Sequence, residues 1–130
     1  MKSVVLCYNL KGTPKGRKIG MIFGFLGFQV RAVDRSRYLW PVGALTGLEE
    51  PEEEPEPYEG EGFPEEMLVI QADTEDKLDK AIFLMRKENV QVGLKAVVTE
   101  ANRKWTSLAL HDEIEKEHEI MTRQEEERNG

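Results

Sequence analysis

One pattern constrains this fold more than any other: an apolar strand, an amphipathic helix and a second apolar strand occur in that order on each side of an acidic segment. The first unit starts with the apolar run Val4–Tyr8, which predicts a buried strand. Thr13 and Pro14 are typical of a helix cap and first helical position, and residues 28–33 predict the next strand. The helix between them has apolar residues at helical spacing, namely Ile19, Ile22, Phe23 and Leu26.

The second unit repeats this pattern. Residues 67–70 predict a strand, Asp73 or Thr74 the cap of a helix, and residues 92–98 a fourth strand. The apolar stripe of the second helix is Leu78, Ala81, Ile82 and Met85. Two such units predict a four-stranded sheet with both helices on one face.

The predicted class is therefore α+β: a ferredoxin-like βαβ-βαβ sandwich with an added C-terminal helix, and a small doubly wound sheet is the rival. The added helix should begin near Thr106, and its inward positions are Leu110, Ile114 and Met121. We expect one domain over residues 1–122, with an acidic insert at 49–66 and a frayed polar tail at 123–130.

Charge is divided unevenly along the chain. The net formal charge is −7, yet residues 1–48 carry +7, and residues 49–66 contain ten Glu and no base. Because its like charges repel and it has little to bury, the insert should be extended and mobile. We expect a solvated spacer, with shielding of the basic front from nucleic acid and recruitment of a basic partner as alternatives.

The residue inventory excludes several classes of protein. Cys7 is the one cysteine, so no intramolecular disulfide can form, and with two histidines no zinc-type Cys/His array can be drawn. The longest apolar stretch, residues 19–28, is too short to span a bilayer, and the start does not read as a signal peptide. We expect a cytoplasmic protein with no membrane partner.

Thr99, Asn102 and Trp105 stand at three-residue steps between a predicted strand and an acidic helix. With residues 41–45 upstream and Glu117-His118 downstream, this stretch resembles a bacterial family catalogued as a domain of unknown function (3783). The resemblance covers residues 38–121. The resemblance implies a bacterial, cytosolic origin, and it does not imply any particular activity. From the residues themselves, we expect Thr99 and Asn102 to support a turn.

The start of the first helix is the predicted anion-binding site. Its residues are Thr13, Lys15, Gly16, Arg17 and Lys18. A helix start already offers free N–H groups and a partial positive charge, so these cations favour a phosphate or carboxylate there. A solvated basic turn, or one neutralised by the chain's own glutamates, is the competing interpretation.

Gly16, Gly20 and Gly24 recur every four residues along the same helix. Since Gly is costly in a helix interior, their shared face should pack closely against something, either within the domain or in a homodimer. A second apolar stripe, Met21, Phe25 and Phe28, lies opposite the inner one, and we expect the C-terminal helix to cover it.

Three further clusters have a structural and a chemical interpretation. Five aromatic residues lie in or beside loops near Arg31, Arg35 and Arg37, and they could stack on bases: Tyr38, Trp40, Tyr58, Phe63 and Trp105. We favour core packing for the two tryptophans.

His111, Glu115 and His118 share one helical face, as metal ligands would, but a solvated face is favoured, so no metal and no cofactor are predicted. Cys7 should be an inert buried residue.

Three functions follow from these observations. The leading hypothesis is a non-enzymatic module that binds a protein partner or a small anion. The second is an enzyme acting on a phosphate or acyl phosphate, in which Arg17 or Lys18 holds the anion and Asn102 orients water. It requires Asn102 to lie beside the start of the first helix. The third is nucleic-acid binding gated by the acidic insert, which the acidic net charge disfavours.

Overall fold

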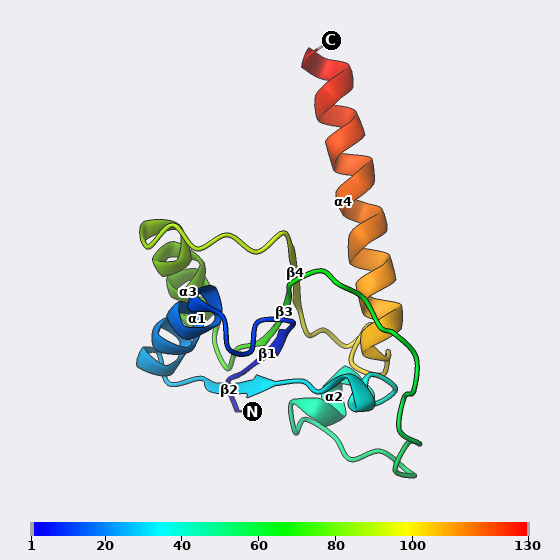
Figure 1. The fold of residues 1–130 in the computed structure, drawn as a ribbon. Coiled ribbons are helices and arrows are strands. Elements are labelled where there is room, and N and C mark those ends of the chain that lie inside the picture. The colour runs from blue at the N-terminus through cyan, green and yellow to red at the C-terminus, as the bar shows by residue number, and fades with distance from the viewer. Residues whose placement is uncertain (1, 130) are drawn as a thin grey trace.

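The computed structural model describes the backbone of residues 2–129 and the side chains of residues 2–118. Its core is a four-stranded sheet of β1 (Val4–Tyr8), β2 (Gln29–Ala32), β3 (Met67–Gln71) and β4 (Leu94–Val97). The helices are α1 (Pro14–Phe25), α2 (Val42–Leu45), α3 (Glu75–Lys87) and α4 (Ser107–Asn129), with a short 3-10 turn, η1, at Arg35–Arg37. Figure 1 shows the chain from the N-terminal strand to α4, which extends away from the domain.

The strand order is β2-β1-β3-β4. β1 pairs with β2 in parallel and β3 with β4 in parallel, whereas β1 and β3 are antiparallel. The predicted α+β class with a four-stranded sheet is confirmed. The split pairing of a ferredoxin-like sheet is not found among the described strands, because each helix connects two strands that are direct neighbours.

Local sequence signals set the bounds of α1 and α3. The side chains of Thr13 and Thr74 cap the two helices by accepting hydrogen bonds from Gly16 N and Lys77 N. α3 also has acidic residues in its first turn and basic residues in its last, which suits the helix dipole. α1 has no acidic residue in its first turn, so its basic start is not balanced from within the helix.

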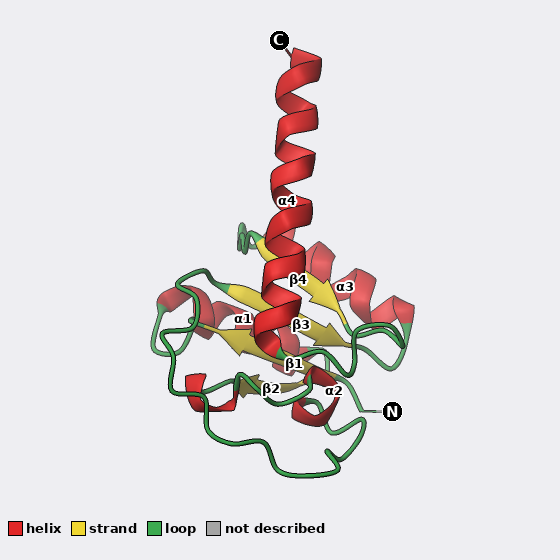
Figure 2. Ribbon diagram, turned by 90° about the vertical axis from the view of Figure 1, so that its right-hand side faces the viewer, coloured by secondary structure: helices red, strands yellow, loops and turns green. Residues whose placement is uncertain are grey.

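Both faces of the sheet are covered. On one face, Val5 and Cys7 of β1 and Leu68 and Ile70 of β3 pack against α1 and α3. On the other face, the alternate residues of the same strands pack against α2, α4 and the chain on either side of α2. Figure 2 shows α4 crossing this second face, opposite α1 and α3.

α4 is anchored at its first turns. Thr106 caps it by accepting from Ala109 N at 3.1 Å, and Leu110 is buried in the second core cluster. At its start, the hydroxyls of Tyr8 and Ser107 form a buried hydrogen bond of 2.6 Å. The side chain of Met121 lies outside the described residues, so the predicted fraying of the tail remains a prediction.

The acidic insert does not form a helix or strand, but its second half is attached to the domain. Phe63 is buried, and the amide of Asn9 donates to the backbone carbonyls of Phe63 and Glu65 at 2.7 and 2.8 Å. The backbone N of Tyr58 donates to the carbonyl of Ser36 at 2.9 Å. The prediction of a mobile spacer overlooked these two aromatic residues, which give the segment apolar area to bury.

Replacing Tyr8 by Phe should reduce the free energy of unfolding by about 1–2 kcal/mol, because the ring stays while the buried Ser107 hydroxyl loses its partner. Urea unfolding followed by circular dichroism measures this. The control is Tyr38→Phe, in which the stacked ring is kept and no hydrogen bond to another side chain is removed; it should change stability by less than about 0.5 kcal/mol. Equal losses in both variants would contradict the anchoring role of Tyr8.

Candidate functional site

One of the three cations at the start of α1 is paired within the chain. Lys15 Nζ lies 2.7 Å from Glu66 Oε1, in an ion pair that is about one-third exposed on each side. The hydroxyl of Thr13 accepts from Gly16 N at 2.9 Å and donates to the Leu10 carbonyl at 2.7 Å. The acidic insert therefore supplies a counterion for Lys15, as the competing interpretation of the basic helix start expects.

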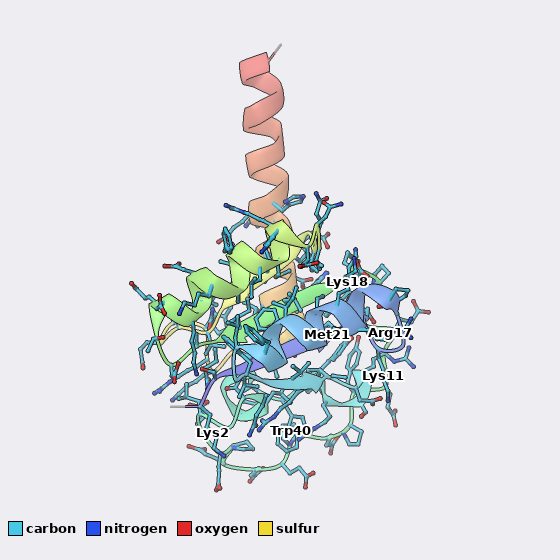
Figure 3. The ribbon with its side chains drawn as sticks, turned by 90° about the vertical axis from the view of Figure 1, so that its left-hand side faces the viewer. Lys2, Lys11, Arg17, Lys18, Met21 and Trp40 are labelled. Carbon is cyan, nitrogen blue, oxygen red and sulfur yellow. The ribbon has the colours of Figure 1, made fainter. Side chains whose placement is uncertain are left out.

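The five residues of the predicted anion site do not converge on one point. Thr13 and Gly16 are used in the cap, Lys15 faces Glu66, and Arg17 is exposed. Lys18 lines a different hollow between α1 and α3. Figure 3 shows Arg17 and Lys18 on the same side of α1 as Met21.

A cavity of about 790 Å³ lies beside Lys15, between the start of α1, the end of α3 and the loop that leads to β4. Its charged lining residues are Lys15, Glu66, Arg86 and Lys95. Lys95 Nζ donates to the Val92 carbonyl at 3.0 Å, which holds this loop against the strand. The lining thus carries a net charge of +2 on a chain whose total is −7.

The outer surface of α1 and α3 exposes three large apolar side chains. Met21, Phe25 and Phe83 are 74%, 83% and 63% exposed. Between the helices lies a groove of about 350 Å³, lined by Lys18, Met21, Ile22, Phe25, Leu84 and Glu88. The expectation that the C-terminal helix covers this stripe is wrong, because α4 packs on the opposite face of the sheet.

The glycines of α1 do not share one environment. A Cβ at Gly16 would overlap the carbonyl oxygen of Leu10, so this position requires glycine. A Cβ at Gly20 or Gly24 would meet nothing within 4 Å. Phe28, predicted on the second stripe, is instead buried and makes an edge contact with Phe23 at 5.0 Å between ring centroids.

Aromatic rings form a continuous stack over the second face of the sheet. Tyr38 stacks on Phe63 at 5.0 Å and on Tyr58 at 6.1 Å, and Phe63 stacks on the His111 ring at 3.9 Å. Arg37 lies 4.3 Å above the Trp40 ring. The rings of Tyr38, Tyr58, Phe63 and His111 therefore contact one another within the chain.

The side chain of His111 is buried in this region and only 7% exposed. Its Nε2 lies 3.2 Å from Glu65 Oε1 and 3.3 Å from Glu115 Oε2. Burial opposes ionisation of Glu65, but hydrogen bonds with Glu115, its own backbone and His111 prevail and lower the pKa of Glu65. From the sequence, His111, Glu115 and His118 were predicted to share one helical face. Glu65 comes from another part of the chain and was not predicted to lie beside them.

Thr99 and Asn102 form a closed turn after β4. Thr99 N donates to Asn102 Oδ1 at 2.8 Å, and the Asn102 amide donates to the Val97 carbonyl at 3.0 Å. Trp105 N donates to the Asn102 carbonyl at 2.9 Å. Trp105 is 38% exposed, so the prediction that it fills the core is wrong.

This turn lies at the opposite end of the sheet from the start of α1. Tyr8, which precedes α1, pairs with Met67, and Met67 pairs with Leu94 at the beginning of β4. Asn102 bonds to the last residue of β4. The enzyme hypothesis required Asn102 beside the start of α1, and the register of the strands separates them.

Cys7 is buried within β1, and burial raises the pKa of its thiol to about 11. At neutral pH it is therefore a thiol and not a thiolate, which is the form required for nucleophilic attack.

One region of the chain is similar to a known protein family. Residues 66–121 are similar to a family of domains of unknown function, DUF3783. This match covers β3, α3, β4 and the first part of α4. No curated protein and no solved structure matches the chain. Among the described helices, none is long and apolar enough to cross a membrane.

Two glycine substitutions four residues apart distinguish packing from exposure along α1. Gly16→Ala should lower the free energy of unfolding by about 2 kcal/mol or more, because its methyl group overlaps the Leu10 carbonyl. Gly20→Ala should raise it by up to about 1 kcal/mol through better helix propensity. Thermal and urea unfolding measure both effects. Destabilisation by Gly20→Ala comparable to that of Gly16→Ala would show that position 20 is packed.

Proposed function

We propose that this chain is a protein-interaction module and that the outer surface of α1 and α3 is its binding surface. The observation that carries the proposal is the exposure of Met21, Phe25 and Phe83 on two regular, well-capped helices. Large exposed apolar side chains beside a groove on rigid elements, as Met21 and Phe25 are, are typical of surfaces that a partner covers.

A second copy of the chain is the partner that fits this surface best. Gly20 and Gly24 leave open space, so another helix can approach α1 closely. The charged residues of the groove are one base, Lys18, and one acid, Glu88. Their charges offset each other, so two copies do not repel across the groove, although each carries −7 in total.

Sedimentation velocity over a concentration series tests this proposal. The wild-type chain should dimerise, and Phe25→Lys should weaken the dimer by roughly 30-fold or more, as expected for loss of a central aromatic contact. The control is Leu39→Lys, a change of similar chemistry at a residue that is also exposed but lies away from α1.

A wild-type chain that stays monomeric up to about 1 mM would overturn the homodimer. Equal weakening by Phe25→Lys and Leu39→Lys would place the interface elsewhere.

The cavity beside Lys15 supports a second candidate, the binding of a small organic anion. Its cationic lining side chains, Lys15, Arg86 and Lys95, would face the anion, while Met85 and Val92 offer apolar contact. In this arrangement Glu66 competes with the anion for Lys15. Arg86, which is exposed at the end of α3, is the cation best placed to contribute without disturbing the loop.

Calorimetry with adenosine monophosphate and with inorganic phosphate tests this candidate. Arg86→Gln should weaken binding about three- to tenfold, the range of a charge-assisted hydrogen bond at a half-exposed site. Lys87→Gln, one residue along and outside the cavity lining, should leave affinity within about twofold. No heat with either ligand at about 1 mM would rule the candidate out.

A further inference from the structure

The cluster of Glu65, His111 and Glu115 has a composition and geometry unlike any other group of side chains in the described part of the chain. Each residue offers one ligand atom, and the three atoms lie within 4.8 Å of one another. His111 and Glu115 are one turn apart on α4, and Glu65 comes from the end of the acidic insert. Two carboxylates thus meet one imidazole nitrogen.

The imidazole of His111 is held in place from two sides. Its ring stacks on Phe63 with an interplanar angle of 9°, and its Nδ1 lies 3.2 Å from Asp112 Oδ1. With the proton on Nδ1 and donated to Asp112, Nε2 presents a lone pair to the two glutamates. A carboxylate behind the distal ring nitrogen is the arrangement that orients histidine ligands in metal sites.

Without a cation, the cluster must hold protons. Two carboxylates beside one imidazole nitrogen repel each other unless they share a proton or accept one from His111 Nε2. Moreover, Oε2 of Glu65 is buried and has no hydrogen-bond partner among the described residues. A buried carboxylate oxygen without a hydrogen bond or a bound cation destabilises the folded protein.

Two of the three separations between the ligand atoms match the edges of a small tetrahedron, and the third is no more than 4.8 Å. Ligand atoms bound to Zn²⁺ at about 2.0–2.1 Å with tetrahedral angles lie about 3.3 Å apart. The observed separations from His111 Nε2 are 3.2 Å to Glu65 and 3.3 Å to Glu115. The side chains of Glu65 and Glu115 are 36% and 45% exposed, so the fourth position opens toward solvent.

We propose that Glu65, His111 and Glu115 bind a divalent transition-metal ion of the Zn²⁺ class. One imidazole nitrogen and two carboxylate oxygens suit Zn²⁺ and Co²⁺, whereas Mg²⁺ and Ca²⁺ prefer oxygen ligands alone. The ion would join the end of the acidic insert to the first turns of α4. Metal binding would therefore stabilise the packing of both segments on the sheet.

The test uses the full chain freed of metal by a chelator. Zn²⁺ titration by calorimetry should give one site per chain, and Co²⁺ should give the visible absorption bands of a four-coordinate ion. Saturating Zn²⁺ should also raise the melting temperature. Glu65→Gln and Glu115→Gln should each weaken Zn²⁺ binding at least about tenfold, because each removes a charged ligand while keeping its shape. Circular dichroism of the metal-free variants verifies their folding.

The matched control is Glu113→Gln, which removes the same charge from an exposed position of α4 outside the cluster. It should change Zn²⁺ affinity less than about twofold. Equal weakening by all three variants would show diffuse attraction of cations to an acidic surface and overturn the site. The absence of both heat and Co²⁺ bands would overturn it as well, and tighter binding of Mg²⁺ than of Zn²⁺ would overturn the proposed metal class.

Discussion

The antiparallel pair of β1 and β3 is the constraint on which the rest of this structure depends. Every residue of both strands is buried, so both must be apolar on two faces, and each face must be covered. The connections between the parallel strand pairs run through α1 and α3, and both helices lie on one face. The other face is left for α4, α2 and the irregular chain around them, which explains why an acidic segment contains the buried side chain of Phe63.

The two faces consequently offer different kinds of chemistry. Where α1 and α3 cover the sheet, regular packing buries the core and leaves Met21, Phe25 and Phe83 exposed on their outer surface. Where irregular chain covers it, residues distant in sequence are brought together, and Glu65 meets His111 across 46 positions. The groove lined by Met21 and Phe25 and the cluster of Glu65, His111 and Glu115 therefore lie on opposite sides of the same sheet.

The caps of α1 and α3 were predicted correctly because a helix cap depends on hydrogen bonds between residues only a few positions apart. Thr13 and Thr74 cap helices through hydrogen bonds from residues three positions on. The prediction that the glycines of α1 share one closely packed face does not hold for Gly20. The spacing of glycines along a helix does not show which of them faces a carbonyl of another segment, and only Gly16 does so of these two. Likewise, a helical face shows that His111 and Glu115 are neighbours, but not that Glu65 completes the cluster.

The amino-acid sequence by itself determined the class of fold, the positions of the strands and main helices, and the surplus of positive charge at the start of α1, because each follows from periodicity, capping and composition. Tertiary structure alone decided the strand order, the face on which α4 packs, and the pairing of Lys15 with Glu66. The physical reason is that apolar strands satisfy either pairing order equally well. Which strands become neighbours in the sheet depends on how whole faces of the sheet and helices pack together, and a local sequence pattern does not contain this information.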